Sequence, residues 1–475
     1  MLKKNSTGDG YILPDGVHVT KRLEHFAVSG KNTETRTIWN VTGYGPIMTK
    51  NGVQKSTHDL VLKWVSIDPE VEDTTFQAFV KLNTATDYDG FREALRSYIA
   101  PAQNFIFAAN GTDGVGDIGY QIPGKIPIRR ANLTGMFPTP LTEAEAWLGF
   151  VNFTDLPHAK NPAKGFIASA NNRAVPPGFK THVTCDWDEG SDGYRAERIT
   201  DMILAGGVGN ATHPGHPKPR HHTVETMKAI QLDYRSYLFR DLNRTVHNIC
   251  AEPTANQQVC QILYGWDGVA AVGSPAATVF QKLYLELMML PRTELGDAFK
   301  FWANPVYLVR AYEAAWDTNA SCTPSKDSKA CKHFAVTALN RAGHSIDDLS
   351  NPPAWGQDVH HAQFTHTILN ASFAKCIANR AVPHGGDDYT VNVGHYDYDD
   401  AAMRQHHGPS YRQIVDFSDL DGSLFLNPLG QYGLELSAHY DDLVEMWSNG
   451  EYMPMLSVDS DYSGSIYHSD TVKPA

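Results

Sequence analysis

Histidine is the residue type in this sequence whose abundance first suggests chemistry. The chain holds 21 histidines, with adjacent pairs at His221–His222, His360–His361 and His406–His407. A helical zinc site needs imidazoles at i and i+4, so that both rings lie on one face of the helix. His361 and His366 are five residues apart, and neither C-x-x-C nor H-E-x-x-H occurs. The sequence therefore predicts no metal site.

The second group with chemical potential is the acidic run Asp397, Asp399 and Asp400. Closely spaced carboxylates can coordinate calcium or act as the carboxylate pair of a glycosidase. We favour the interpretation that this run is a solvated loop. The sequence has no G-x-S-x-G elbow and no P-loop, and Gly114-Val115-Gly116 is too short to bind phosphate. Generic motifs thus leave the reaction open.

Cysteines and glycosylation sequons point to the secretory pathway. Cys250 and Cys260 are ten residues apart, and Cys322 and Cys331 are nine apart, so each pair is a plausible local disulfide. Buried free thiols are the alternative. The sequence contains nine N-x-S/T sequons, whereas chance predicts about three. This surplus is typical of a glycosylated, secreted eukaryotic protein. The sequons begin at Asn5, Asn40, Asn110, Asn132, Asn152, Asn210, Asn243, Asn319 and Asn370.

The first residues of the sequence do not resemble the signal peptide that a secreted protein needs. Residues 1–8 include two lysines but no apolar segment of a signal peptide. We therefore expect that the beginning of the protein is missing. The longest apolar stretch, Leu283–Leu290, is interrupted by Glu286, so we expect no membrane span. A net charge of −13 disfavours binding to a phosphate backbone, and we expect no nucleic-acid partner.

The first part of the chain carries strand signals, then helical ones, then a hairpin. Residues 10–70 contain β-branched and aromatic runs, such as Leu60–Val65, that predict strands. Over residues 74–100, apolar side chains recur every three to four positions and predict helix. Asn104–Ala108 and Asp117–Ile122, joined by Gly, Asn and Asp turn residues, predict a β-hairpin.

Residues 195–345 are predominantly helical in pattern. Apolar side chains from Met227 to Leu238 predict one helical face, and those from Val279 to Leu287 predict another. Strand signals return at Ser410–Phe417 and Ser423–Leu426. Strands, then helices, then strands predict an α+β fold with a helical insertion.

Six sequence blocks carry more specific information. They include Pro-Ala-Gln-Asn-Phe-Ile-Phe-Ala within residues 101–130, Gly-Phe-Ile-Ala-Ser-Ala-Asn-Asn-Arg at 165–173, Trp-Asp-Gly at 266–268, Pro-His-Gly-Gly-Asp-Asp-Tyr-Thr-Val-Asn at 383–392, Gly-Pro-Ser-Tyr-Arg-Gln-Ile-Val-Asp at 408–416 and His-Tyr-Asp-Asp at 439–442. In this order they closely resemble the large subunit of penicillin acylases, the penicillin amidase family of N-terminal-nucleophile (Ntn) hydrolases.

The resemblance implies a fold and a division of the chain. The fold would be the C-terminal part of an αββα Ntn-hydrolase sandwich with an inserted helical subdomain. Residues 1–194 would hold core strands and the hairpin, residues 195–350 the helical subdomain, residues 351–460 the return to the core sheet, and residues 461–475 a polar tail. The implied activity is hydrolysis of linear amides, such as the acyl side chains of β-lactams or N-acyl-homoserine lactones.

The resemblance also assigns roles to individual residues. Asn104 matches the asparagine whose side-chain amide stabilises the oxyanion. Arg129 matches an arginine that supports the site, with the adjacent Arg130 as the alternative. Asn171 and Asn172 match a pair near the substrate pocket, where we expect them to form hydrogen bonds. A small-molecule acyl amide is the expected substrate, and no cofactor is implied.

The sequence departs from the family pattern at the nucleophile. In the family, a serine in Ser-Asn-Asn-Trp or similar begins the large subunit, and its own α-amino group is the general base. No such serine occurs here, so we expect a missing small-subunit or N-terminal segment to supply it. The insertion Asn110–Gly116 displaces the aspartate expected for the family calcium site, so a calcium ion is doubtful. Tyr44 replaces the usual histidine before Gly45-Pro46.

Two hypotheses follow from the missing nucleophile. In the first, the chain is part of a secreted penicillin-acylase-like amidohydrolase and is inactive in isolation. In the second, it is a non-catalytic secreted relic that binds an acyl group or a partner surface. The sequence alone does not decide between them.

Overall fold

The computed structural model describes the chain except for residues 7–9, 49–56, 111–115, 131–132, 134, 136, 142–146, 177, 185–192, 207–221, 296–304, 319–327, 367–368, 370–374 and 457–475. Helices and strands both occur, as the predicted α+β class requires. The predicted polar tail 461–475 and most of the insertion 110–116 lie outside the described residues.

The chain divides into two compact units. Unit 1 comprises Met1–Ser169 and Arg173–Asp188, and unit 2 comprises Ala170–Asn172 and Glu189–Ala475. The segments 195–350 and 351–460 therefore belong to the same unit. Asn104 and Arg129 lie in unit 1, whereas Asn171 and Asn172 lie in unit 2.

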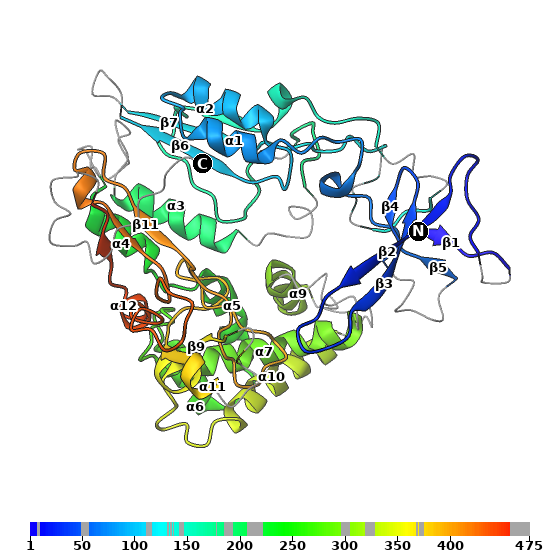
Figure 1. Cartoon of the computed structure of the whole chain (residues 1–475). Coiled ribbons are helices and arrows are strands. Elements are labelled where there is room, and N and C mark those ends of the chain that lie inside the picture. Colours follow the sequence, from blue (N-terminus) through cyan, green and yellow to red (C-terminus); the bar gives the residue numbers. More distant parts are fainter. Residues whose placement is uncertain are drawn as a thin grey trace. The chain divides into compact units, whose positions relative to one another are not determined.

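The described residues of unit 1 form short sheets and the helices α1 and α2 (Figure 1). One sheet has the strand order β2-β3-β4 and another has the order β6-β7-β8, and a further pair joins β1 to β5. The elements are β1 (Leu2–Lys3), β2 (Val19–Phe26), β3 (Glu34–Val41), β4 (Gly45–Pro46), β5 (His58–Asp59), α1 (Thr75–Leu82), α2 (Tyr88–Ala94), β6 (Phe105–Ala109), β7 (Asp117–Gln121) and β8 (His158–Lys160), with helical turns at Val65–Ile67, Leu95–Ser97 and Phe153–Asp155.

The predicted hairpin is confirmed and packs against α1 and α2, the helices that form within residues 74–100, where helix was predicted. Strands β6 and β7 pair antiparallel, and Phe105 and Phe107 of β6 face the helices. Their ring centroids lie 5.1 Å from Tyr98 and 5.2 Å from Phe91, respectively. The opposite face of β6 leaves Ile106 exposed. Alternation along the strand thus separates an aromatic core face from an open face.

Glycine at position 119 lets α2 approach β7 closely. A Cβ atom built at Gly119 would lie 2.3 Å from the Tyr88 ring, a distance that no packed side chain tolerates. The Asp87 carboxylate caps α2 by accepting the backbone N–H of Gly90 at 2.7 Å. Cap and glycine together fix how the helix lies on the hairpin.

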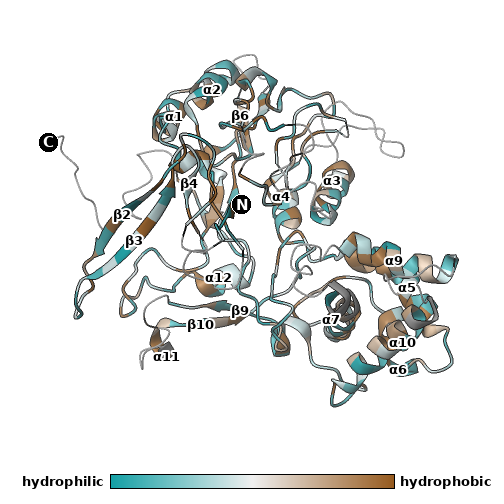
Figure 2. Cartoon of the chain, turned by 90° about the vertical axis from the view of Figure 1, so that its right-hand side faces the viewer, coloured by the Kyte–Doolittle hydropathy of each residue, from teal (hydrophilic) through white to brown (hydrophobic). Residues whose placement is uncertain are grey.

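Unit 2 begins with helices and ends with short strands (Figures 1 and 2). Helices α6 and α10 pack against α7, and α9 packs against α5 and α10. The elements are α3 (Tyr194–Gly206), α4 (Val224–Gln231), α5 (Tyr237–Cys250), α6 (Gln257–Tyr264), α7 (Pro275–Leu295), α9 (Pro305–Asp317), α10 (Ser328–His344), a π-helical turn (Trp355–Val359), β9 (His361–Phe364), α11 (Lys375–Ala378), β10 (Arg380–Pro383), β11 (Arg412–Ile414), a helical turn (Leu420–Gly422), β12 (Leu424–Leu426), α12 (Val444–Ser448) and β13 (Met453–Pro454).

The core of unit 2 confirms the apolar face predicted for residues 279–287. Val279, Phe280, Leu283 and Leu287 of α7 are all fully buried. The strand signals near residue 412 and residue 424 are also confirmed, since β11 and β12 pair antiparallel. Among the described residues, no helix combines the length and apolarity needed to cross a membrane.

Two predicted elements are wrong in detail. The face from Met227 to Leu238 belongs to two helices, because Ser236 accepts the N–H of Phe239 and starts α5 after α4 has ended at Gln231. Leu60–Val65 is no strand. Only Val61 forms an isolated bridge, and alternate side chains of this run remain exposed. In both places the local sequence pattern does not determine the length of the element, because tertiary contacts decide it.

The predicted disulfide between Cys250 and Cys260 is confirmed. It joins the end of α5 to α6, and both cysteines are buried. Cys331 is also disulfide-bonded, and Cys322, the partner predicted from its spacing, lies outside the described residues.

Removing the Cys250–Cys260 bond should lower the free energy of unfolding by about 2–3 kcal/mol. The bond closes a loop of sequence separation 10, which restricts the unfolded chain. The double variant Cys250→Ala/Cys260→Ala, unfolded by denaturant without reductant, measures the effect. Cys376→Ala leaves this bond intact and is the control. An unchanged midpoint in the double variant would contradict the prediction.

Candidate active site

Asn104 lies directly before β6, at the end of the open face of the hairpin. Its side-chain Oδ1 accepts a hydrogen bond from the hydroxyl of Tyr120 on β7 at 2.5 Å. The two residues are diagonal neighbours on paired strands, with Ile106 directly opposite Tyr120. The asparagine itself is exposed. The hairpin therefore holds the amide of Asn104 by its oxygen.

The hydroxyl of Tyr120 fixes which way the amide of Asn104 faces. Burial raises the pKa of Tyr120 well above its ordinary value, so the phenol stays protonated and remains a donor. Asn104 Oδ1 accepts this hydrogen bond, so the NH₂ group of the amide points away from Tyr120. Within the described part of the chain, Nδ2 has no hydrogen-bond acceptor. An outward amide N–H on a strand is the donor that an oxyanion needs.

Arg129, the predicted supporting arginine, lies in the loop that follows β7. It lines two open cavities of unit 1, one of them together with Arg130 and Asp155. Its guanidinium packs against Gly135, where a Cβ atom would come within 3.0 Å. Asn104 lines neither of these two cavities. The supporting role of Arg129 stays a prediction.

The asparagine pair lies in a tight turn of unit 2. Asn171 adopts the left-handed conformation, with φ of 63°, which asparagine tolerates better than most residues. Asn172 Oδ1 accepts the backbone N–H of Ala170 at 3.0 Å and so stabilises the turn. Asn171 Oδ1 accepts from Nη2 of Arg195 at 2.8 Å. Asn171 thus contacts the side chain of Arg195, whereas Asn172 bonds to the backbone of its own turn.

Asn171 and Arg195 line a cavity of about 660 Å³ in unit 2. The wall of this cavity continues along residues 388–409, which contribute carboxylate, imidazole and apolar side chains. The remaining lining residues are Asp388, Val391, Val393, His395, His406, His407, Gly408 and Pro409.

Arg195 is a candidate site residue that could not be predicted from the sequence. It lies in the first turn of α3, where the positive end of the helix dipole disfavours a cation. The guanidinium of Arg195 instead donates a hydrogen bond to the amide oxygen of Asn171, which offsets the unfavourable helix-dipole interaction. The position of this cation has no meaning in the sequence until the start of the helix is known.

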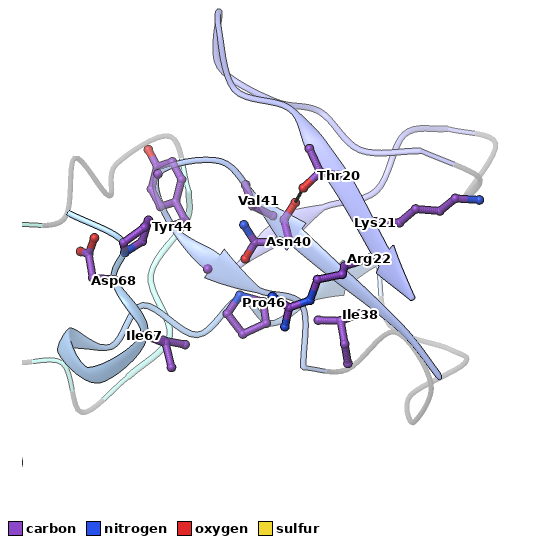
Figure 3. Close-up of a pocket in the computed structure, with 13 residues that line it drawn as sticks. Thr20, Lys21, Arg22, Ile38, Asn40, Val41, Tyr44, Pro46, Ile67 and Asp68 are labelled. Carbon is purple, nitrogen blue, oxygen red and sulfur yellow. Dashed lines mark hydrogen bonds between the residues drawn. The ribbon is translucent and has the colours of Figure 1, made fainter. Parts of the chain in front are cut away.

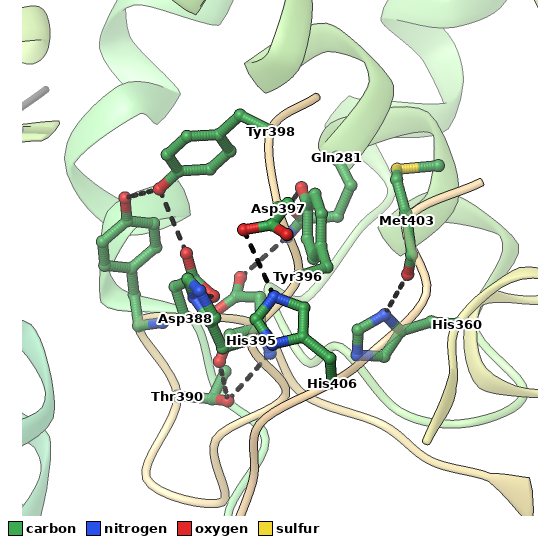
Figure 4. Close-up of polar contacts among 12 residues, drawn as sticks. Gln281, His360, Asp388, Thr390, His395, Tyr396, Asp397, Tyr398, Met403 and His406 are labelled. Atoms are coloured by element: carbon green, nitrogen blue, oxygen red, sulfur yellow. Dashed lines mark hydrogen bonds and ion pairs between the residues drawn. The ribbon is translucent and has the colours of Figure 1, made fainter. Parts of the chain in front are cut away.

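A buried polar network holds the cavity wall in place (Figure 4). Asp387 accepts hydrogen bonds from Gln281 of α7 at 2.8 Å and from the backbone N–H of Tyr389 at 2.8 Å. Burial raises the pKa of Asp387 to about 6. Tyr398 donates to Asp388 at 3.1 Å, and Tyr389 lies within hydrogen-bonding distance of Tyr398. This network anchors the segment to the helical core.

Another cavity, of about 500 Å³, lies beside the β2-β3-β4 sheet (Figure 3). Tyr44 lines it, and Lys63 lies over the Tyr44 ring at 5.6 Å from the centroid. Its lining includes Arg22, Asp68 and apolar side chains, but none of the four predicted site residues. Each unit therefore holds a candidate site of its own: the amide of Asn104 in unit 1, and the Asn171–Arg195 cavity in unit 2.

Comparison with known proteins finds relatives that are named as acylases. The chain is 25% identical over 473 residues to an acyl-homoserine lactone acylase QuiP of Pseudomonas syringae pv. syringae (strain B728a), covering 94% of this chain and 54% of that protein. It is 25% identical over 426 residues to the penicillin acylase 2 proenzyme of Pseudomonas sp. (strain SE83), covering 87% and 51%. The chain thus spans about half the length of these curated relatives.

The fold matches a solved structure over the whole chain. A thermostable penicillin G acylase from Alcaligenes faecalis superimposes with a TM-score of 0.72 at 17% identity, covering 100% of this chain and 85% of that one. This confirms the predicted α+β fold of the Ntn-hydrolase type. The family model for penicillin amidase matches residues 2–463. The chain therefore belongs to the penicillin amidase family.

Proposed function

We propose that the chain is the part of an amidohydrolase that binds the acyl amide and stabilises the oxyanion during cleavage of a linear C–N bond. The amide of Asn104, held by Tyr120 with its NH₂ outward, is the observation that carries the proposal. Membership of the penicillin amidase family and the names of two relatives as acylases support it.

The substrate class follows from the relatives. Acyl-homoserine lactones and penicillins both present an acyl group on an amide nitrogen, and their acylases are named for that bond. Asn171 and Arg195 would bind a polar substrate group in their cavity, since each offers N–H donors. Arg129 remains the proposed supporting residue in unit 1.

The nucleophile is proposed to come from a segment outside these 475 residues. The chain spans about half of its relatives and contains no Ser-Asn-Asn-Trp sequence. An N-terminal serine would attack the carbonyl, and its α-amino group, with an ordinary pKa of about 7.7–8.0, would accept the hydroxyl proton. This chemistry requires no cofactor at the reacting atoms, and we propose none for it.

The isolated chain should release no acid from a chromogenic phenylacetyl amide or from an acyl-homoserine lactone. The same chain extended upstream, through an in-frame Gly-Ser-Asn-Asn in the genomic sequence, should process itself and hydrolyse one of them. Turnover by the isolated chain would contradict the missing nucleophile. A longer protein that matures but hydrolyses no linear amide would contradict the amidohydrolase assignment.

A non-catalytic binding protein is the second candidate, and one surface favours it. Helix α1 exposes Phe76 by 80%, Val80 by 54% and Phe79 by 47%. Exposed apolar clusters of this kind mark interaction surfaces. A chain that binds an acyl amide in calorimetry, while no upstream exon with a nucleophile exists, would support this candidate over the enzyme.

We also propose that the protein is secreted and glycosylated. The sequon residues Asn40 and Asn152 are exposed, and Cys250–Cys260 is a disulfide of the type found in oxidising compartments. Treatment of protein from its native host with an N-glycosidase should lower its apparent mass. An unchanged mass would contradict glycosylation.

A further inference from the structure

Three side chains with metal-ligating atoms meet at the edge of the unit 2 cavity. His395, Asp397 and His406 each offer one ligand atom, and these atoms all lie within 4.8 Å of one another. The Nε2 atom of His406 lies 3.3 Å from Oδ1 of Asp397 (Figure 4). The ring centroids of the two histidines are 4.9 Å apart. His395 and His406 also line the cavity, so an ion held there would face it.

The backbone fixes the two segments that carry these side chains. The N–H of His395 donates to the carbonyl of His407 at 3.0 Å, and the N–H of His406 donates to the carbonyl of His395 at 3.1 Å. These bonds form an antiparallel bridge between His395 and His407. The spacing of the two imidazoles is therefore set by paired backbone.

Asp388 orients the ring of His395 for a metal. Its Oδ1 lies 2.6 Å from Nδ1 of His395, and its own side chain is mostly buried. Tyr398 donates to the other carboxylate oxygen, at 3.1 Å. A carboxylate on Nδ1 places the proton there and leaves Nε2 as a lone-pair donor. Nε2 of His395 has no hydrogen-bond partner among the described residues.

We propose that His395, Asp397 and His406 form a binding site for a divalent transition-metal ion of the zinc class, at the wall of the Asn171–Arg195 cavity. Two imidazoles and one carboxylate suit zinc and its neighbours, whereas calcium and magnesium prefer all-oxygen sites. Ligand atoms in a tetrahedral zinc site lie about 3.3 Å apart, so the three side chains must converge slightly. Asp397 and His406 are exposed enough to rotate, with side-chain exposures of 70% and 46%.

The ion would leave at least one coordination position for water or a ligand. Three protein ligands and an open fourth position are typical of zinc sites that bind a further molecule. Because His395 and His406 line the cavity of Asn171 and Arg195, that position faces the cavity. The sequence reasoning missed this site because its ligands come from two segments and follow no helical spacing.

The test is titration of the full chain with Zn²⁺ in a calorimeter, and with Co²⁺ followed by visible absorption. The wild-type chain should bind one Zn²⁺, and His395→Ala should lose this binding. Co²⁺ bound to the wild-type chain should give the ligand-field bands of an imidazole-ligated ion. Asp388→Asn should weaken this binding by about 10–100-fold, because the ring of His395 loses its orienting carboxylate. His407 lines the same cavity but is not a proposed ligand, so His407→Ala should bind Zn²⁺ as the wild type does.

Several outcomes would overturn the proposal. Equal Zn²⁺ binding by the wild type and His395→Ala would show that other histidines hold the ion. Unchanged Zn²⁺ affinity in Asp388→Asn would contradict the proposal that Asp388 orients the ring of His395. If His395→Ala fails to fold, as judged by circular dichroism, Asp397→Ala and His406→Ala test the site instead. Their side chains are 70% and 46% exposed, so their removal should not disturb the fold. Unchanged binding in these two variants would equally refute the site.

Discussion

Replacing Asn104 with alanine should lower kcat of the active protein by about 10²–10³-fold while KM changes little. The active protein here means this chain together with the segment that supplies the nucleophile. The amide N–H of Asn104 stabilises charge that develops only in the transition state, so its loss affects kcat more than substrate binding. Steady-state hydrolysis of a chromogenic acyl amide measures both constants.

The variants beside Asn104 separate oxyanion stabilisation from a change in fold. Gln103→Ala removes the exposed neighbouring side chain and should leave kcat near the wild-type value. Tyr120→Phe removes the hydroxyl that positions the amide, at 2.5 Å, and should lower kcat by less than Asn104→Ala does. Asn104→Asp should be as poor as alanine, because a carboxylate offers no N–H. Wild-type kcat in Asn104→Ala would refute the oxyanion role.

The part of this site that could be predicted from sequence is its local part. The hairpin of β6 and β7 is encoded by alternating residues and by turn residues close in the chain, so its existence was predictable. The residue that orients Asn104 was not. Tyr120 is distant by 16 positions, and only the pairing register places it beside the amide. Register depends on how the whole sheet is buried.

The rest of the site depends on contacts between distant segments. Asn171 and Arg195 are 24 residues apart and meet through a left-handed turn and the start of a helix. Gln281 and Asp387 are 106 residues apart and meet in the buried network. Neither pair has a periodic signal, because tertiary packing alone brings it together. The resemblance to a known family supplied Asn171, while nothing in the spacing supplied Arg195.

Replacing His384 with phenylalanine should remove much of the loss of stability that the protein suffers in acid. The ring of His384 is fully buried and stacks on Trp447 of α12 with centroids 4.4 Å apart. Burial, followed by the charges of Arg412 and His360, lowers its pKa from 6.5 to about 3. The imidazole is therefore neutral in the folded protein at neutral pH.

The sign of the pH effect follows from where the proton binds. Between pH 3 and 6.5 the unfolded chain protonates His384 and the folded chain does not, so acid favours unfolding. Over this pH interval the free energy of unfolding falls by about 5 kcal/mol. This is a large share of the roughly 5–15 kcal/mol that stabilises a domain. The contribution is complete above pH 6.5 and is lost as the pH falls through the folded value.

Phenylalanine suits this position because the replacement breaks no hydrogen bond of the imidazole ring. Within the described part of the chain, neither ring nitrogen of His384 has a hydrogen-bond partner. An aromatic hydrocarbon keeps the stack on Trp447, at the cost of fitting a slightly larger ring. At pH 7.5 the variant should therefore be about as stable as the wild type, and at pH 4 it should be more stable by several kcal/mol.

Denaturant unfolding of both proteins from pH 4 to pH 8 measures the difference. His247→Phe is the matched control, because its ring also stacks on an aromatic side chain, Tyr264 at 4.5 Å, but is exposed. The control should follow the wild-type curve, since an exposed imidazole is solvated in either state. His360, whose pKa burial lowers to about 4, remains in the variant and leaves part of the acid sensitivity. Parallel pH curves for His384→Phe and the wild type would show that folding leaves the pKa of His384 unchanged, and would contradict the prediction.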